Sequence, residues 1–249
     1  MTEGFEAQQY DAIGAHWKNA RELPTVYPER ESFLRLLGDV SGSRVLDLAC
    51  GDGFYTRQIK QLGAERAVGV DISPAMIEAA RAAERQAPLG AEYLVADAGD
   101  PDLSELGRFD LVTAGYLVNY AKDAEELTDM CRGARSLLGR GGRFIGVTQH
   151  PRFSFDGPRP DPYGFVFDRQ RVTPFGTYIQ VTAALQPPIS FETCLIRPEV
   201  YAHAFAAAGF SELRWVEMTV GKDAMRRFGD DFWQDFLANP PIVLFEARS

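Results

Sequence analysis

The chain has 249 residues with a formal net charge of −9, and its 45% of apolar residues is sufficient for the core of one large domain. The acidity opposes binding to nucleic acid or to an anionic membrane surface, which both require basic faces, and no apolar run approaches the roughly 20 residues of a membrane helix. The chain start lacks a signal-peptide pattern and the three cysteines are widely spaced, so we expect a cytoplasmic monomer or homodimer without a metal site.

The first elements expected along the chain are two helices within residues 5–38, which separate at Leu23-Pro24. Tyr10 and Trp17 are seven residues apart, so they share one face of the first helix. In the simplest interpretation, both rings pack this helix onto the core.

The segment Val45–Gly53 (VLDLACGDG) predicts an apolar strand that enters a tight glycine turn, followed by a helix. Gly51 and Gly53 allow a ligand to approach the backbone, and the same order of strand, glycine loop and helix begins the dinucleotide-binding folds. However, Asp47 and Asp52 would repel a pyrophosphate, whereas their charge suits an ammonium or sulfonium group. The pattern therefore favours S-adenosylmethionine over NAD.

A second buried strand, Val68–Asp71, ends in a carboxylate 20 residues after Gly51. This spacing is expected for an acid that accepts hydrogen bonds from ribose hydroxyls. Ser73 is a suitable N-cap, and Pro74 is a suitable first residue, for the helix that follows.

Two further strands are expected at Ala91–Val95, which leads to Asp97, and at Phe109–Ala114, which leads to Tyr116. Alternating strands and helices predict a parallel sheet, whose ligands lie beyond the carboxyl ends of the strands. The polar side chains expected at that edge are Asp47, Asp71, Asp97 and Tyr116.

An amphipathic helix over residues 123–138 and a fifth strand over 143–148 follow. Residues 150–190 then hold seven of the fifteen prolines and many Phe and Tyr residues, and they predict a small antiparallel insertion with strands at 165–167 and 178–182. Such an insertion can cover the active-site edge, where aromatic walls suit a flat substrate; alternatively, these rings form an accessory core of their own. The remaining expected elements are a helix over 198–208, a strand over 213–220, a short helix over 228–237 and a last strand over 242–247.

The motifs LDLACGDG, GVDIS, VADA and DLVTAGYLVNYA occur in the order typical of class I S-adenosylmethionine-dependent methyltransferases, which the chain resembles. Within that family it is most similar to the toxoflavin N-methyltransferase group and to natural-product indole C3-methyltransferases. The resemblance implies an α/β fold with a Rossmann-like, seven-stranded, mostly parallel sheet and helices on both faces. It divides the chain into an N-terminal helical lid (1–40), a cofactor-binding core (41–149), the β insertion (150–196) and the C-terminal part of the core (197–249).

The resemblance also implies S-adenosylmethionine as cofactor and S-adenosylhomocysteine as product. Asp71 would bind the ribose, Ile72 and Met76 would sandwich the adenine, and Asp97 would accept from its amino group; each acid has the alternative of capping its loop. The full set of expected cofactor-binding residues is Tyr10, Trp17, Asp47, Ala49, Gly51, Gly53, Asp71, Ile72, Met76, Asp97, Ala98 and Gly115.

Methyl transfer requires positioning, dehydration and sometimes a base. His150, directly after the fifth strand, can accept a proton at neutral pH, or it is a structural loop histidine. The other expected catalytic residues are Tyr116, Glu192 and Tyr178, and the expected substrate-binding residues are Asn119, Tyr120, Phe153 and Tyr163.

The predicted function is transfer of a methyl group to a small aromatic or heteroaromatic natural-product precursor, at a ring carbon such as indole C3 or at a ring nitrogen. Methylation of an oxygen remains an alternative, as does a cofactor-binding module without transfer activity. An NAD-dependent dehydrogenase is opposed by Asp47 and by Thr56, which stands where the third glycine of the NAD motif would be.

Overall fold

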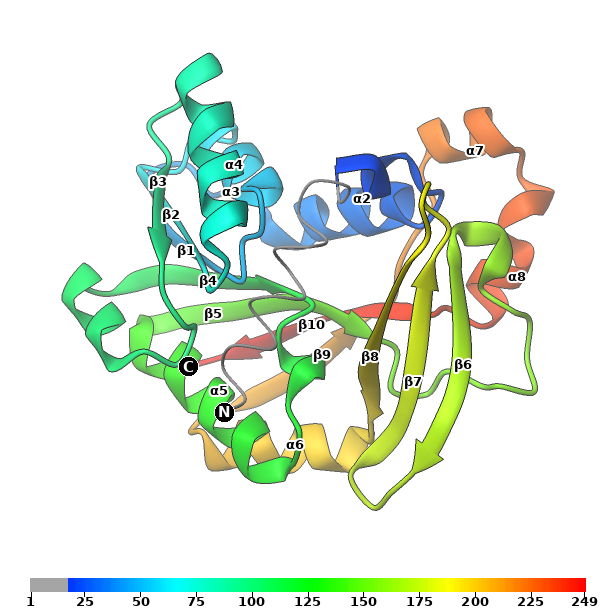
Figure 1. Cartoon of the computed structure of the whole chain (residues 1–249). Helices are drawn as coiled ribbons and strands as arrows, with labels where there is room; N and C mark the ends of the chain where they lie inside the picture. The colour runs from blue at the N-terminus through cyan, green and yellow to red at the C-terminus, as the bar shows by residue number, and fades with distance from the viewer. Residues whose placement is uncertain (1–17) are drawn as a thin grey trace.

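The computed structural model describes residues 18–249, which form a seven-stranded sheet, its covering helices and a separate three-stranded sheet (Figure 1). The strand order of the large sheet is β3-β2-β1-β4-β5-β10-β9, and β10 alone runs antiparallel to its neighbours. This confirms the predicted mostly parallel sheet. The strands are β1 (Arg44–Leu48), β2 (Arg66–Asp71), β3 (Glu92–Val95), β4 (Phe109–Gly115), β5 (Leu138–Gln149), β9 (Glu212–Val216) and β10 (Ile242–Arg248).

Helices cover both faces of this sheet, as predicted, and two hydrophobic cores fill the space between the layers (Figure 1). One face carries α5 (Ala124–Leu137) and α6 (Pro198–Ala207), whose Cys131 and Phe205 pack against strand residues such as Phe144. On the other face, Phe33 of α2 and Ile59 of α3 pack against the sheet. The helices of this second face are α2 (Val26–Leu37), α3 (Phe54–Gln61), α4 (Pro74–Gln86), α7 (Lys222–Phe228) and α8 (Gln234–Ala238).

Local capping explains where several of these helices begin. The Ser73 hydroxyl accepts a hydrogen bond from the Met76 N–H (3.2 Å), with Pro74 at the first helical position of α4. Asp123 accepts from the N–H groups of Glu125 and Glu126 at the start of α5. Both helices therefore start where the sequence predicts.

The order of strands leaves a crevice where ligands bind in open α/β sheets. β1 pairs with β2 on one side and β4 on the other, so the chain connections turn in opposite directions at its carboxyl end. Of the lid expected at residues 1–40, the structure describes only the part from residue 18 onward, with a 3-10 turn at Lys18–Glu22 and then α2; Tyr10 and Trp17 lie outside the described residues.

The segment between β5 and α6 forms the small antiparallel sheet, which stands beside the carboxyl ends of the large sheet in Figure 1. It contains β6 (Phe165–Val172), β7 (Gly176–Ala183) and β8 (Ile189–Ile196). The sequence predicts only the first two strands; β8 pairs along the whole of β7 and completes the sheet. One face of it is apolar, with Phe167, Val181 and Phe191 buried.

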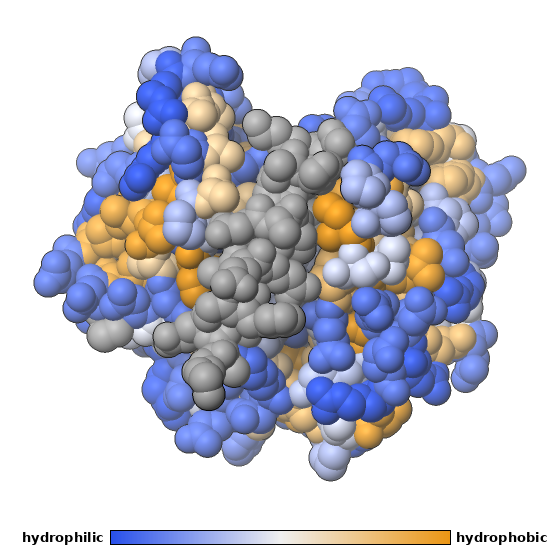
Figure 2. Space-filling model, viewed as in Figure 1, coloured by the Kyte–Doolittle hydropathy of each residue, from blue (hydrophilic) through white to orange (hydrophobic). Residues whose placement is uncertain are grey.

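On the face drawn in Figure 2, hydrophobic residues reach the surface on both sides of the grey atoms, and the periphery is mainly hydrophilic. Between residues 18 and 249, no helix is both long and apolar enough to cross a membrane. In the same part of the chain, no three His, Cys, Asp or Glu side chains gather as metal ligands would.

Candidate active site

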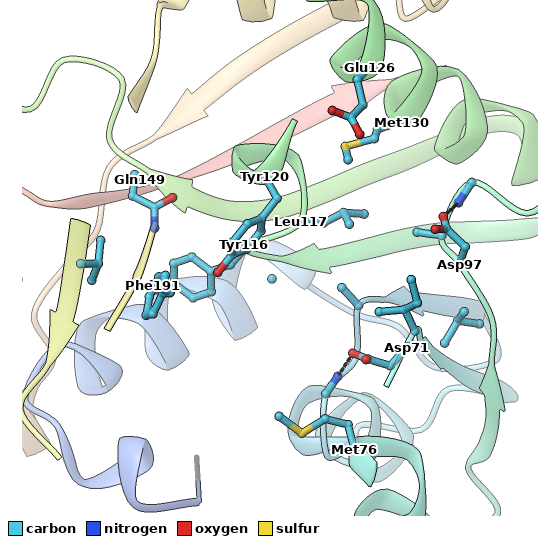
Figure 3. Close-up of a pocket in the computed structure, with 18 of the residues that line it drawn as sticks. Asp71, Met76, Asp97, Tyr116, Leu117, Tyr120, Glu126, Met130, Gln149 and Phe191 are labelled. Carbon is cyan, nitrogen blue, oxygen red and sulfur yellow. Dashed lines mark hydrogen bonds between the residues drawn. The ribbon is translucent and has the colours of Figure 1, made fainter. Parts of the chain in front are cut away.

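A pocket of about 410 Å³ lies at the carboxyl ends of the parallel strands, against the apolar face of the small sheet (Figure 3). Asp71, Met76 and Asp97 lie on one side of this view, and Gln149, Tyr120 and Phe191 on the other. We call the first side the loop end, lined by Ala49, Gly51, Asp71, Ile72, Met76, Asp97, Ala98 and Gly115. The second side is the aromatic end, lined by Tyr116, Tyr120, Gln149, Phe165, Phe167, Val181, Phe191 and Ile242.

The glycine turn after β1 has one glycine at the pocket and one beneath it. Gly51 has a φ of +55°, and a Cβ added there would meet nothing within 4 Å. Gly53, with φ +79°, is different, because a Cβ there would lie 2.6 Å from the Tyr93 hydroxyl oxygen. Gly51 thus leaves room for a ligand, whereas Gly53 is required for packing against Tyr93 and does not line the pocket.

Asp71 holds the turn in place and still faces the pocket. Its Oδ2 accepts a hydrogen bond from the Gly51 N–H (2.8 Å), and its Oδ1 accepts from the Ser73 N–H (2.9 Å). A carboxylate has about four acceptor sites, so Asp71 can bind this backbone and a ligand hydroxyl together. Asp97 is exposed at the same end, and its Oδ1 accepts from the Gly99 N–H (2.7 Å).

Asp47 does not reach the pocket, which corrects the expectation that it binds the cofactor directly. Its side chain is 3% exposed, and its two oxygens accept hydrogen bonds from the hydroxyls of Thr56 (2.6 Å) and Thr113 (2.8 Å). Burial raises the pKa of Asp47 to about 6, against the lowering effect of these two hydroxyls. Asp47 therefore ties β1 to α3 and β4 beneath the glycine turn.

Tyr116 is connected to a buried acid on α2 that the sequence analysis missed. The hydroxyls of Tyr116 (2.6 Å) and Tyr55 (2.7 Å) both donate to the Glu29 carboxylate, whose pKa is raised by burial although both hydroxyls oppose the shift. Tyr116 also has a left-handed φ of +57°, a strained conformation for a residue with a Cβ. Nothing in the sequence pattern distinguishes Glu29 from a solvated helix acid.

His150 lies outside the pocket, and both of its ring nitrogens have partners. Nδ1 accepts a hydrogen bond from the Arg152 N–H (3.0 Å), which leaves the proton of the neutral ring on Nε2, 3.4 Å from a Glu217 carboxylate oxygen. Burial lowers the pKa of His150 although Glu217 raises it. In this arrangement no lone pair of the ring faces an acceptor molecule, so His150 does not meet the geometry expected of the base.

Two other expected catalytic residues also lie away from the pocket lining. Glu192 is exposed on β8, with a carboxylate oxygen 3.9 Å from a nitrogen of Arg171. Tyr178 donates its hydroxyl to the Lys122 carbonyl (2.8 Å), and the Arg171 guanidinium lies 3.5 Å from its ring centre. Both side chains are therefore placed where they stabilise the small sheet.

Of the four expected substrate-binding residues, Tyr120 lines the pocket and Asn119, Phe153 and Tyr163 do not. Asn119 is buried and donates from Nδ2 to the Thr193 hydroxyl (2.9 Å), which fastens β8 to the turn after β4. Phe153 packs its ring against Phe167. Tyr163 is buried in the core between the large sheet and α2, where its hydroxyl donates to the Phe232 carbonyl (2.8 Å).

The charged side chains of the pocket lining are acidic, and its aromatic end contains an amide oxygen without a partner among residues 18–249. Asp71 and Asp97 lie at the loop end, Glu126 and Asp129 of α5 also line the pocket, and no Lys, Arg or His of residues 18–249 does. Gln149, the residue before His150, is 4% exposed, and its Oε1 has no hydrogen-bond partner in the described structure. The sequence analysis passed over Gln149 because the adjacent histidine has the more familiar chemistry.

The part of the chain that builds this loop end matches a known family. Residues 45–142 match the family model described as "Methyltransferase domain". The fold of residues 18–249 is also similar to that of a solved S-adenosylmethionine-dependent methyltransferase from Mesorhizobium loti, with a TM-score of 0.63 and 20% identity, covering 89% of this chain and 98% of that one. This likeness confirms the α/β, Rossmann-like fold class predicted from the motifs.

Solved structures extend the similarity over almost the whole chain. The chain superposes on the protein described as "DhpI-SAM-HEP complex", with a TM-score of 0.64 and 20% identity, covering 100% of this chain and 99% of that one. A putative S-adenosylmethionine-dependent methyltransferase from Listeria monocytogenes has a TM-score of 0.64 at 20% identity, covering 92% and 99%. At these identities the likeness concerns the fold.

Sequence relatives match a shorter part of the chain. A "Ubiquinone biosynthesis O-methyltransferase" of Xanthomonas oryzae pv. oryzae is 27% identical over 144 residues, which cover 56% of this chain. The match spans 59% of the length of that relative. The small sheet, which supplies one wall of the aromatic end, lies outside the residues that match the family model.

Proposed function

We propose that the protein transfers a methyl group from S-adenosylmethionine to a small aromatic or heteroaromatic molecule, at a ring carbon such as indole C3 or at a ring nitrogen. The observation that carries the proposal is the continuity of one pocket, which joins an acidic loop end to an apolar aromatic end. A cationic cofactor and a flat acceptor need these two environments next to each other.

The loop end fits the cofactor in shape and in charge. The open space beside Gly51 and Gly115 admits a ligand close to the backbone, and the Asp71 carboxylate lines the pocket where ribose hydroxyls would lie. Ile72 and Met76 offer apolar surfaces for a base. When bound, the cofactor supplies a methyl group activated by a positively charged sulfur, and the surrounding carboxylates favour that charge.

At the aromatic end, the protein's task is to orient the acceptor and exclude water. Phe167, Val181 and Phe191 are buried and form one wall, and the methyl-accepting atom would face the loop end from there. Because His150 faces Glu217, an acceptor that needs no strong base suits this site best, as an electron-rich ring carbon or a neutral ring nitrogen does.

A phenolic oxygen is the second candidate acceptor. It is favoured by the relatives that are described as ubiquinone biosynthesis O-methyltransferases, which match over 56% of this chain. A phenol must lose its proton on transfer, so its methylation rate would rise with pH as the free phenolate forms, whereas methylation of a neutral ring carbon or nitrogen would not follow that titration.

The first experiment is calorimetric titration with S-adenosylhomocysteine, with NADH as control ligand. Micromolar binding of S-adenosylhomocysteine and no binding of NADH are expected, and the reverse would contradict the proposal. Incubation with S-adenosylmethionine and a panel of indoles, nitrogen heterocycles and phenols, followed by mass spectrometry, then identifies the atom that gains a methyl group. Cofactor binding without methylation of any compound would favour a binding module.

A further inference from the structure

Gln149 is the last residue of β5, and strand geometry directs its side chain to the pocket. Val147 packs in the core beneath α2, and Thr148 turns to the opposite face, where its hydroxyl lies 3.0 Å from that of Tyr201. Alternation along the strand then returns Gln149 to the side of Val147. There it lines the aromatic end together with Ile242, its partner on β10 (Figure 3).

The backbone around Gln149 is held on both sides. β5 and β10 pair from Arg143 to Gln149, and the His150 N–H donates to the Pro241 carbonyl (2.8 Å) immediately beyond. A side chain carried by such a rigid strand end is positioned more accurately than one on a loop. The position of the Gln149 side chain is therefore fixed accurately enough to orient a ligand through a hydrogen bond.

The Gln149 side chain is buried, with 4% of its surface exposed, and its amide oxygen Oε1 is not hydrogen-bonded to any of residues 18–249. Buried amides are almost always hydrogen-bonded, because an unpaired one loses its bonds to water without replacement. Rotation about the last side-chain bond exchanges Oε1 with Nε2, so either atom of the amide can be turned toward the pocket.

Neighbouring polar groups do not provide the missing bond. The Tyr116 hydroxyl donates to Glu29, the Thr148 hydroxyl lies next to Tyr201, and both His150 nitrogens have partners. The walls that face Gln149 across the pocket are the apolar side chains of the small sheet. Among residues 18–249 no neighbour donates to this oxygen, so a molecule inside the pocket can supply the donor.

We infer that Gln149 binds the methyl acceptor by accepting a hydrogen bond from an N–H or O–H group on its aromatic ring. The inference rests on the proposed function and specifies its substrate class: a flat ring that carries a donor group, in place of a purely hydrocarbon or sulfur ring. The bond orients the ring within the aromatic end. Gln149 thus acts in acceptor recognition and takes no part in holding the cofactor.

The test uses pairs of ring compounds that differ only in the donor group, measured by calorimetry with the full chain saturated with S-adenosylhomocysteine. Indole is compared with benzothiophene, in which sulfur replaces the N–H group, and 2-naphthol is compared with naphthalene. Wild-type protein is expected to bind the donor compound of at least one pair about tenfold more tightly, the effect of one hydrogen bond to a buried group. The pair that shows the preference distinguishes an N–H from an O–H donor.

Three variants separate this role from a structural one. Gln149→Leu is expected to lose the preference, to within about twofold, while its affinity for S-adenosylhomocysteine and its thermal unfolding stay near wild type. Gln149→Glu keeps an oxygen acceptor and is expected to keep the preference. Gln180→Leu, on the exposed side of β7, is the matched control and should behave as wild type.

Several outcomes would overturn the inference while leaving the proposed function intact. These are wild-type protein that binds S-adenosylhomocysteine but neither donor ring, equal binding of both members of each pair, and a preference that persists in Gln149→Leu. Failure to bind S-adenosylhomocysteine, by contrast, is a failure of the proposed function itself. Should Gln149→Leu not fold, the ring pairs with wild-type protein and Gln149→Glu still decide the matter.

Discussion

The loop end of the pocket is built mainly from turns that directly follow β1, β2 and β3, whereas one wall of the aromatic end is built from side chains of a separate sheet. At the loop end, backbone groups and carboxylates are fixed by bonds between near neighbours, such as the one from Ser73 to Asp71. At the aromatic end, the wall depends on distant contacts such as that from Asn119 to Thr193. The two ends of the pocket therefore differ in how far along the chain their supporting contacts lie.

The largest expected effect concerns Asp47, which supports the loop end from below. Its pKa is raised from 3.8 to about 6, so between these values the folded state holds a proton that the unfolded chain has released. The contribution of Asp47 to stability therefore falls as the pH rises through this window, by about 3 kcal/mol, and stays at its low level above pH 6. Asp47→Asn does not titrate, so its stability relative to wild type should rise by a similar amount between about pH 4 and pH 7.

Urea unfolding of the two proteins across this pH range measures the effect, with Asp168→Asn on the exposed side of β6 as a control. A stability difference that does not change with pH would show that Asp47 is ionised in the folded protein at all these pH values.

The next largest effect is expected from Asp71→Ala, which removes a ligand at the loop end only. Loss of the carboxylate leaves ribose hydroxyls unpaired, so cofactor affinity should fall by about 1–3 kcal/mol. Titration with S-adenosylhomocysteine measures the change, and Asp168→Ala is the matched control for loss of one negative charge. Unchanged affinity would remove Asp71 from the proposed cofactor site.

A smaller effect is expected from Asn119→Ala, which loosens the support of the aromatic end. Loss of its hydrogen bond to Thr193 should lower the free energy of unfolding by about 1 kcal/mol and weaken binding of the ring acceptor, while binding of S-adenosylhomocysteine stays near wild type. Thr182→Ala, whose hydroxyl bonds to Ser190 on the exposed side of the same sheet, is the control. Equal losses of affinity for the ring acceptor and for S-adenosylhomocysteine would mean that the aromatic end and the loop end are not independent.

The smallest effect is expected from Glu192→Gln. This acid is exposed and lies 3.9 Å from Arg171, and such surface pairs contribute on the order of 0.5 kcal/mol or less. Stability and the turnover of any acceptor found in the panel should both remain within about twofold of wild type. A large loss of turnover would restore Glu192 as a candidate base and place the acceptor differently.

Much of the fold and of the loop end could be predicted because the signals are local. The glycine turn, Asp71 and the Ser73 cap lie within short stretches whose conformation depends on nearby residues. Asp47 was misplaced because the turn pattern shows that an acid is present but not whether it faces the ligand or the core. Only the contacts with Thr56 and Thr113 decide that question.

The aromatic end could not be predicted in the same way. Which rings face the pocket depends on the register of β6 and β7, which shifts between Arg169 and Arg171, and on the pairing of β8, a strand absent from the expected elements. Gln149 stands out as a candidate binding residue only through its burial and the absence of a partner for its Oε1 among residues 18–249. The role of Glu29 depends on its hydrogen bond from Tyr116, which lies 87 residues later in the chain, so no local pattern predicts it.

The small sheet leaves the core at the end of β5, at Gln149, and returns to it at the start of α6, at Pro198. It is thus one continuous stretch of chain that supplies one wall of the aromatic end and none of the loop end. Under the proposed function, replacing this stretch by another between the same two points would change which acceptor is methylated, while the loop end keeps its structure. Gln149 lies just before the replaced stretch, so it would remain in place and favour acceptors with a donor group.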